Sequence, residues 1–259
     1  MKFLLINSTK DIAANNLTEE LFKSYNFTEI KPNLYKLQID ALNEIYLKKI
    51  NDIHIHTKKE NICNDEIDFD QIIFLSRHST LSKTKSKCMT VHAIGNWGIA
   101  ELGGNDFTIV KTDPILIRSL LLNLKENKNP EIKQYEVKQE ATHHGPYLEI
   151  PTIFYEIGSI DNDWKNKDVS KYMIRILIDT IKNYNKKKII LEQNWIETVG
   201  VGGSHYCTRF NKLTFNRNKK YCFGHVVPSY AIKNITPEIL EDAKNKSNSK
   251  KIIYEEDII

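Results

Sequence analysis

Side chains that can move protons or bind a metal gather in a few short stretches of this chain. The densest stretch, residues 140–146, reads EATHHGP and holds a glutamate, two adjacent histidines and a Gly-Pro turn. Imidazoles and carboxylates serve as general acids and bases and as ligands for metals such as zinc. We therefore expect a catalytic or metal site assembled from five clusters, which are residues 76–79, 90–96, 140–146, 156–159 and 202–206 with 224–225.

The two adjacent histidines are expected to have different roles. If their stretch is extended, Glu140, Thr142 and His144 share one face and His143 lies on the other. One histidine then enters the site and the other braces the turn, unless the turn has already begun at His143. Glu156, on the next predicted strand, can hydrogen-bond an imidazole, fix its tautomer and raise its basicity.

Hydrophobic periodicity predicts the elements that must position these residues. Asp113 and Pro114 mark the start of one helix, as cap and first helical residue. The predicted strands cover residues 2–7, 34–40, 44–50, 52–57, 69–78, 89–95, 135–144, 152–158, 196–206, 219–228 and 251–257, and the predicted helices cover 11–24, 112–127, 166–185 and 236–244.

Strands that alternate with helices indicate one α/β domain over residues 1–259, with a central mixed sheet flanked by helices. Residues 1–70 contain few candidate groups and are expected to be mainly scaffold, whereas residues 71–230 carry the site. Each cluster lies where a predicted strand ends or turns. Ligands bind at strand ends in open α/β sheets, so we expect the clusters to converge.

Composition limits the classes of protein to which this chain can belong. The net charge of +4 permits an RNA partner without demanding one. The four cysteines include no CxxC pair, a pattern typical of reduced cysteines in a cytosolic protein. No stretch resembles a signal peptide or a membrane span, so we expect a cytoplasmic protein that does not contact membranes.

Several familiar catalytic motifs are absent from the sequence. The stretch GVGGSH at residues 200–205 is not a dinucleotide-binding motif, because His205 replaces the third glycine. Tyr206 likewise removes the match to the nucleophile elbow of serine hydrolases. There is also no phosphate-binding P-loop and no HExxH motif. Nucleotide triphosphatases, Rossmann dehydrogenases, serine α/β-hydrolases and zincin proteases therefore have no support.

Each cluster also has a simpler structural explanation. A single histidine at a strand end is more often a hydrogen-bonded structural residue than a catalyst, and glycines often serve only in turns. His54 and His56 have the spacing of a metal pair on one strand face, but they lie in the region expected to be scaffold. Five clusters at five strand ends are better explained by one shared site.

Taken together, these clusters resemble the D-aminoacyl-tRNA deacylases of the archaeal and plant type. Six stretches match that family in its order: SRHS at 76–79, TVHAIGN at 90–96, EATHHGP at 140–146, EIGS at 156–159, GVGGSHY at 200–206 and GHVVPSY at 224–230. They cover most of the chain from residue 72 onward, and together they are far more specific than any one motif. The loop before residue 90, residues 186–199 and the C-terminal tail differ from the family pattern.

The resemblance implies hydrolysis of the ester between a D-amino acid and the 3′-terminal adenosine of tRNA, with broad side-chain tolerance, which protects translation. It also implies dependence on zinc and a fold related to peptidyl-tRNA hydrolase and nucleoside phosphorylases. We expect a monomer whose partner is D-aminoacyl-tRNA. The main alternative is a peptidyl-tRNA hydrolase-like enzyme acting on N-blocked aminoacyl-tRNA. A non-catalytic binder of RNA ends and a nucleoside phosphorylase are further alternatives.

Two chemistries stay open for the site. In one, zinc is held by histidines, and Glu140 is a further ligand or a base. In the other, no metal takes part, and His143 or His144 is a general base oriented by Glu156. The expected catalytic residues are Glu140, His143, His144 and Glu156, and the expected zinc ligands are His78, His92, His144 and His205. The expected substrate-binding residues are Arg77, Asn96, Thr142, Gly202, Gly203, Tyr206 and His225.

Contacts with the RNA end can be expected from three features. Backbone amides of the GVGGS stretch can cradle an oxyanion or the terminal phosphate. Tyr206 or Trp97 can stack on the terminal adenine, unless these aromatic rings belong to the core. A basic stretch beside the first histidine of the site suits acceptor-stem phosphates; it consists of Arg77, Lys83, Lys85 and Lys87.

Overall fold

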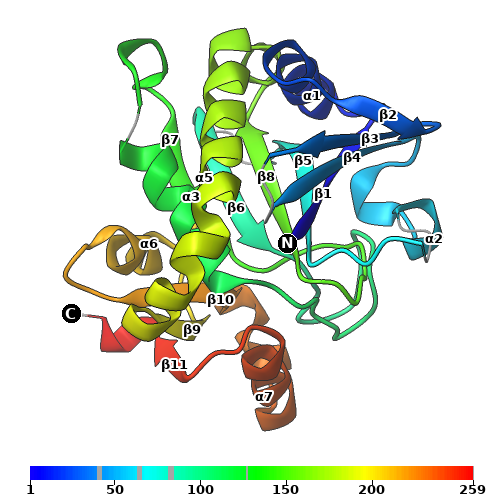
Figure 1. Ribbon diagram of the computed structural model, residues 1–259. Coiled ribbons are helices and arrows are strands. Elements are labelled where there is room, and N and C mark those ends of the chain that lie inside the picture. The colour runs from blue at the N-terminus through cyan, green and yellow to red at the C-terminus, as the bar shows by residue number, and fades with distance from the viewer. Residues whose placement is uncertain (40–42, 63–65, 81–84, 127, 259) are drawn as a thin grey trace.

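The computed structural model describes residues 1–39, 43–62, 66–80, 85–126 and 128–258. A mixed eight-stranded sheet forms the centre of the molecule, and a smaller parallel sheet of three strands lies beside it (Figure 1). The α/β class and the mixed central sheet are confirmed, whereas the separate small sheet was not foreseen. Within the described ranges, no helix has the length and apolar character needed to cross a membrane.

The central sheet has the strand order β2-β3-β4-β1-β5-β8-β6-β7. Strands β4, β1, β5 and β8 run parallel, and β6 runs antiparallel to β8. The small sheet has the order β10-β9-β11. The strands are β1 (Lys2–Ser8), β2 (Thr28–Lys31), β3 (Leu34–Gln38), β4 (Glu44–Ile50), β5 (Gln71–His78), β6 (Cys88–Ala93), β7 (Glu136–Gln139), β8 (Thr152–Gly158), β9 (Ile196–Val201), β10 (Tyr221–Val227) and β11 (Lys251–Tyr254).

Side-chain caps begin several of the helices. Asp113 Oδ1 accepts the N–H groups of Ile115 and Leu116 at 3.0 and 3.2 Å, which confirms the predicted cap. The helices are α1 (Ile12–Ser24), α2 (Lys59–Ile62), α3 (Pro114–Glu126), α4 (Asp161–Trp164), α5 (Lys167–Asn194), α6 (Thr208–Phe215) and α7 (Pro237–Lys246). The short 3₁₀ helices in the described part of the chain are η1 (His54–His56), η2 (Pro130–Ile132), η3 (Ser229–Asn234) and η4 (Glu255–Asp257).

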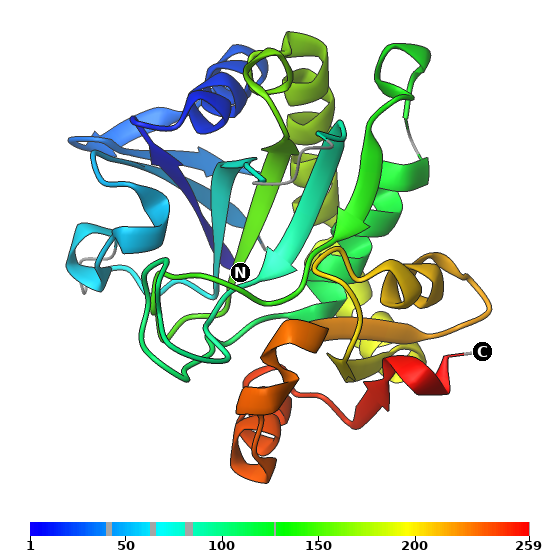
Figure 2. The ribbon, with the colours of Figure 1, turned by 180° about the vertical axis from the view of Figure 1, so that it is seen from behind.

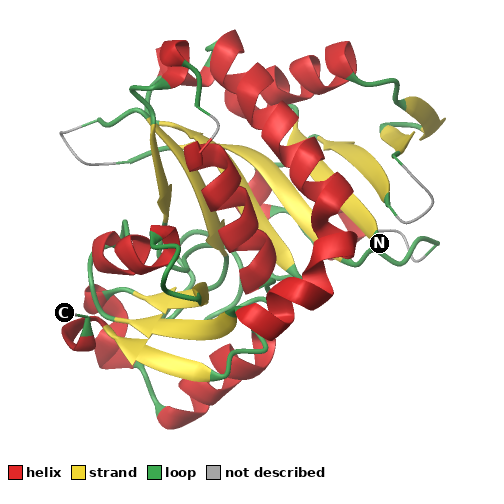
Figure 3. Ribbon diagram, turned by 60° about the vertical axis from the view of Figure 1, so that its left-hand side comes forward, coloured by secondary structure: helices red, strands yellow, loops and turns green. Residues whose placement is uncertain are grey.

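The two faces of the central sheet are covered differently. Helices α1, α3 and α5 bury their apolar sides, such as Leu17, Leu120 and Leu177, against one face (Figure 3). Loop residues cover the other face, where the rings of Phe74 and Phe154 stack with centroids 4.6 Å apart. These loops gather at one end of the central strands, near the C-terminal elements (Figure 2). Polar side chains can therefore enter from the loop side.

The predicted strand over residues 52–57 is wrong. These residues contain η1, in which successive side chains turn by about 120°, so that residues two apart do not share a face. His54 is buried and His56 is exposed, and they do not form the metal pair that a strand would allow. His54 Nε2 instead accepts the backbone N–H of Ser8 at 3.0 Å.

The predicted strand over residues 135–144 ends early, at Gln139. Beyond it, the backbone N–H groups of Ala141 and Thr142 donate to His205 and Val226, at 2.8 and 3.0 Å. The chain thus leaves the central sheet and pairs with the C-terminal part of the molecule. His144 has a φ of 48°, outside the extended region. The alternation expected for this stretch therefore stops before the two histidines.

Candidate active site

A cavity of about 540 Å³ lies on the loop-covered side of the central sheet. Asp11 and His54, from the segments that follow β1 and β4, form part of its wall. The end of β5 and the middle of β8 contribute further groups, which are Arg77, His78, Phe154 and Glu156. The segment after β7 adds His143 and His144, and the turn after β9 adds His205. Residues far apart in the sequence are thus brought to one cavity, as expected.

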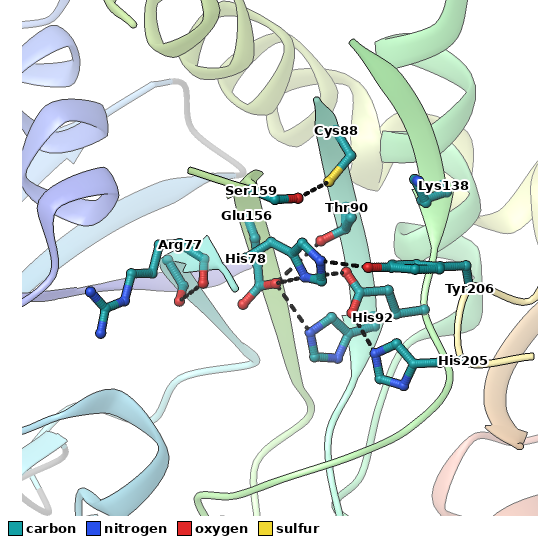
Figure 4. A network of polar contacts seen from close by, with 12 residues as sticks. Arg77, His78, Cys88, Thr90, His92, Lys138, Glu156, Ser159, His205 and Tyr206 are labelled. Carbon is teal, nitrogen blue, oxygen red and sulfur yellow. Dashed lines mark hydrogen bonds and ion pairs between the residues drawn. The ribbon is translucent and has the colours of Figure 1, made fainter. Parts of the chain in front are cut away.

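His78 lies at the centre of a network of polar contacts (Figure 4). Its Nδ1 atom is 3.0 Å from Oε1 of Glu140 and 3.5 Å from Oε2 of Glu156. Its Nε2 atom is 3.1 Å from the hydroxyl of Tyr206. Burial disfavours a charge on His78, but the two carboxylates outweigh burial and raise its pKa far above the ordinary value. His78 therefore holds a proton between two carboxylates.

Glu156 is braced from the neighbouring strand. The hydroxyl of Thr90 donates to Oε2 of Glu156 at 3.2 Å, and Nε2 of His92 lies 3.7 Å from the same oxygen. Both contacts follow from register, because β6 and β8 pair antiparallel with Thr90 opposite Glu156. Glu156 thus contacts His78 and His92. The sequence had suggested that it would orient His143 or His144 of the turn, and this expectation is not met.

Glu140 joins the buried network to the histidines of the cavity. It is 1% exposed, and its Oε2 atom is 3.0 Å from Nε2 of His205 and 3.8 Å from Nε2 of His143. Burial opposes its ionisation, but the hydrogen bonds with His205 and His78 outweigh burial and hold its pKa well below the ordinary value. One carboxylate therefore orients two imidazoles from distant segments of the chain, His78 and His205, and lies close to a third.

Three histidines of the site contact a backbone oxygen through the same ring nitrogen, Nδ1. Nδ1 of His92, His143 and His144 contacts the backbone oxygens of Ala93, Ala141 and Gly145 at 3.0, 2.8 and 2.7 Å. A carbonyl oxygen can only accept, so each Nδ1 carries a hydrogen and each neutral ring keeps its lone pair on Nε2. The three rings are packed together, with centroids 4.3 to 5.2 Å apart. Their Nε2 atoms are free to accept a proton or bind a metal.

Burial also keeps the histidines of the turn neutral. Burial, followed by the neighbouring His144 and His92, holds the pKa of His143 well below its ordinary value. Burial and His92 lower the pKa of His144 to about 4. Both imidazoles are therefore uncharged at neutral pH, which is the form required of a zinc ligand or a general base.

Three groups of side chains place their ligand atoms within 4.8 Å of one another in the described ranges. The first is His92, His143 and His144, the second is Glu140, His143 and His205, and the third is His78, Glu140 and Glu156. His92 Nε2 in the first group is buried and has no hydrogen-bond partner. The first group has the donor set of a catalytic zinc site, three imidazoles, although the burial of His92 is outweighed by Glu156, which raises its pKa, so that a metal would have to displace a proton there.

Nine of the residues expected at the site are brought together. Arg77, His78, His143, His144, Glu156 and His205 line the cavity. Glu140 and His92 contact these residues from behind, and Tyr206 bonds His78. Arg77 lies at the rim, 45% exposed in its side chain, with its guanidinium 5.3 Å from the ring centroid of Trp164.

Other expected residues lie away from the cavity. Thr142 and His225 are buried and bond each other at 3.1 Å, and the hydroxyl of Thr142 also accepts the N–H of Val226. Asn96 donates to the backbone oxygens of Gly103 and Asn105, at 2.8 and 3.2 Å, and so shapes a loop. These three polar side chains serve neighbouring backbone or side-chain groups and do not line the cavity.

The glycine-rich stretch after β9 is a turn. Gly202 and Gly203 have φ values of 108° and 82°, which favour glycine, and a side chain at either position would press against Glu255. Neither lines the cavity, but the turn that they form leads directly to His205. Their expected role as an oxyanion or phosphate cradle stays a prediction.

The expected RNA contacts are only partly placed. Trp97 is 4% exposed and belongs to the apolar core between η3 and the small sheet, so its ring is not available for stacking. Tyr206 is partly buried, and Nζ of Lys138 lies 4.4 Å from its ring centroid. Of the basic stretch, Lys85 and Lys87 are exposed, and Lys83 lies outside the described residues.

The sequence did not point to Asp11, and it pointed to His54 only as half of a metal pair with His56, not as part of this cavity. Asp11 caps α1 through Oδ1, which accepts the N–H of Ala14 at 2.8 Å, and its Oδ2 accepts the N–H of Arg77 at 3.1 Å. Burial raises the pKa of Asp11. One signal was available for Asp11, because it is a helix cap that directly follows a strand, at the end of the sheet where ligands bind. For His54 there was none.

The fold and the cavity together define an α/β protein with a histidine–carboxylate centre suited to hydrolytic chemistry. The sequence model of the family described as D-aminoacyl-tRNA deacylase matches residues 65–258. This chain therefore belongs to the D-aminoacyl-tRNA deacylase family. The matched range contains all seven residues of the histidine–glutamate network, which are His78, His92, Glu140, His143, His144, Glu156 and His205.

Curated relatives and a solved structure agree with this assignment. The D-aminoacyl-tRNA deacylase of Picrophilus torridus is 34% identical over 253 residues, covering 97% of this chain and 89% of that protein. The deacylase of Archaeoglobus fulgidus is 31% identical over 257 residues, covering 98% of this chain and 87% of that protein. The crystal structure of AF0625, a conserved protein of unknown function, has a TM-score of 0.84 and 29% identity, and the match covers 100% of this chain and 87% of that one.

Proposed function

We propose that this protein hydrolyses the ester of D-aminoacyl-tRNA and releases the D-amino acid and the tRNA. The observation that carries the proposal is the family match over residues 65–258, which includes the complete histidine–glutamate network of the cavity. An aminoacyl ester is an activated bond, so a positioned water, a base and a donor for the developing oxyanion suffice. The cavity supplies neutral imidazoles and a proton-holding histidine for these tasks.

The chemistry of the first histidine group fits zinc. His92, His143 and His144 offer three imidazoles whose Nδ1 atoms are anchored by backbone oxygens, and the buried Nε2 of His92 has no hydrogen-bond partner. We propose that these three residues hold the ion, with Glu140 and His205 beside His143. Bound zinc would lower the pKa of a water molecule and polarise the ester carbonyl. The expectation that His78 is a ligand is less well matched, because both of its ring nitrogens have other partners.

The protein's own residues then have distinct tasks. Glu140 orients His78 and His205, while the backbone oxygens of Ala93 and Ala141 orient His92 and His143. His78 keeps a proton between the two carboxylates and so fixes the buried network, and the group that takes a proton from the attacking water can return it to the departing 3′-oxygen of the ribose. Without a metal, the lone pair of His143 or His144 would take the proton from water instead.

A substrate panel tests the proposed function. We expect D-Tyr-tRNA to be hydrolysed much faster than L-Tyr-tRNA or N-acetyl-L-Tyr-tRNA. Release of the N-acetyl amino acid at the highest rate would instead support a peptidyl-tRNA hydrolase-like enzyme. Binding of tRNA without release of any amino acid would contradict catalysis altogether.

A metal experiment separates the two chemistries. Thorough chelation should abolish turnover, and added zinc should restore it, with about one ion bound by the group of three histidines. His92→Ala should lose that ion, whereas the surface variant His56→Ala should retain it. Full turnover by a protein shown to be free of zinc would refute the metal role and leave His143 or His144 as the base. The expectations of a monomer and of a cytoplasmic location stay predictions; light scattering tests the former.

A further inference from the structure

Tyr230 is an exposed aromatic residue beside the cavity. It lies in η3, just after β10, and 62% of its surface is exposed. Its hydroxyl is 3.4 Å from Nδ1 of His205, whose Nε2 bonds Glu140 and whose ring lines the cavity. One end of the phenol is therefore tethered at the candidate active site, while most of the residue remains accessible to a ligand.

The backbone around Tyr230 is held on both sides. The N–H of Ser229 donates to the oxygen of Gly203 at 2.9 Å, which joins η3 to the turn that carries His205. Ala231 is 4% exposed and packs in the apolar cluster that contains Trp97 and Val227. The ring therefore needs little ordering on binding, which lowers the entropic cost of using it as a contact surface.

Exposed cationic and apolar groups continue the surface of η3. Lys233 is exposed, and Ile232 is 45% exposed. An accessible aromatic ring with a nearby lysine is the combination that binds an unpaired nucleotide, because the base stacks on the ring and the cation pairs with a phosphate. The rings expected from the sequence to stack are less suitable, since Trp97 is buried and Tyr206 bonds the buried His78.

We propose that Tyr230 is the platform on which the 3′-terminal adenine of the tRNA stacks, with Lys233 placed for the adjoining phosphate. This inference rests on the proposed function, because an aminoacyl ester at the 3′ end of tRNA is separated from the terminal base by a single ribose. A scissile bond beside His205 thus brings the base to the neighbourhood of Tyr230. The anchored backbone of η3 keeps the ring beside the turn that carries His205, and the ring supplies the binding energy.

Binding of uncharged tRNA tests the platform without catalysis. The probes are one tRNA that ends in CCA and the same tRNA without its terminal adenosine. We expect the wild type to bind the complete tRNA about tenfold more tightly, as stacking of one base on an aromatic ring allows. Tyr230→Ala should lose this preference, and Tyr230→Phe should keep it. The matched control is Tyr254→Ala, since Tyr254 is 42% exposed but lies in β11, whereas the hydroxyl of Tyr230 contacts His205 of the cavity.

A kinetic ratio tests the same claim during turnover. The ratio compares kcat/KM for 3′-O-(D-tyrosyl)adenosine with kcat/KM for D-tyrosine methyl ester, which has no base. Tyr230→Ala should lower this ratio about tenfold or more, and Tyr230→Phe should preserve it. Equal losses on both substrates, or a loss in Tyr230→Phe as large as in Tyr230→Ala, would overturn the platform. Failure of the wild type to release D-tyrosine from tRNA would refute the proposed function, while the binding preference would still decide the role of Tyr230.

Discussion

Replacement of Glu140 by glutamine removes one charge from the centre of the site while preserving the shape of the side chain. In the wild type, the two carboxylate oxygens serve two imidazoles, with distances of 3.0 Å to His78 and 3.0 Å to His205. A glutamine has one acceptor oxygen and one donor group. One of the two imidazole N–H groups must therefore face an N–H donor, and the proton held on His78 loses half of its compensation.

The loss of stability in Glu140→Gln depends on how deeply the two imidazole partners, His78 and His205, are buried. Removal of one member of a buried charge pair destabilises proteins by about 3–5 kcal/mol. The side chain of His205 is 32% exposed, so water can replace its lost acceptor, and His78 keeps Glu156. We therefore expect the low end, about 3 kcal/mol, and a decrease in Tm of about 6–12 °C for a protein of this size.

The assay is urea and thermal unfolding of the metal-free protein at pH 7. Glu149→Gln is the control, since Glu149 lies in the same segment but is exposed and forms a surface ion pair with Lys59, and it should change stability by less than about 0.5 kcal/mol. The pKa of Glu140 is held below 4.5, so its contribution is present above pH 4.5 and is lost as the pH falls below that value. Equal stability of Glu140→Gln and the wild type at pH 7 would refute this account of the network.

Three further outcomes follow from the same contacts. Thr142→Val should lower the free energy of unfolding by about 1–3 kcal/mol, because the N–H of Val226 loses its acceptor. The KM for D-Tyr-tRNA should not change, and a raised KM at unchanged stability would restore a substrate-binding role for Thr142. Burial lowers the pKa of His54 from 6.5 to about 3, so the unfolded chain binds a proton at His54 between these pH values and the folded chain does not. As the pH falls through this range, the free energy of unfolding of the wild type should decrease by up to about 1.4 kcal/mol per pH unit more than that of His54→Gln. Identical dependence of unfolding free energy on pH in the two proteins would contradict this. His144→Ala should lower kcat/KM for D-Tyr-tRNA at least a hundredfold, and near-normal turnover would exclude His144 from the reaction.

Much of the fold could be predicted because local pattern and tertiary environment agree. The strand that ends at His78 and the helix that begins after Asp113 were both read from apolar spacing and a cap. Helix α5 extends to Asn194, beyond the predicted end at 185, because its last turns consist of good helix formers that need no buried face. Residues 52–57 alternate like a strand, but they form η1 because His54 bonds Ser8 of a different strand.

The candidate site was predicted by residue type more reliably than by role. Alternation assigned Glu140 and Thr142 to one face, yet Glu140 meets His78 and Thr142 bonds His225 in a separate buried contact. Both assignments depend on a strand that ends at Gln139, after which the backbone pairs with the C-terminal segment. No local pattern reports a partner more than sixty residues away.

The sequence by itself determined the α/β class, the family and the inventory of histidines and glutamates, because periodicity and motif order are local properties of the chain. Tertiary structure alone decided which of these groups meet. Strand order places β8 between β5 and β6, and so sets Glu156 between His78 and His92. Carbonyl contacts in the folded chain decide which nitrogen of each histidine is free. Tautomer and burial depend on neighbours in space, and these neighbours turn the residues of the EATHHGP stretch into a defined chemical site.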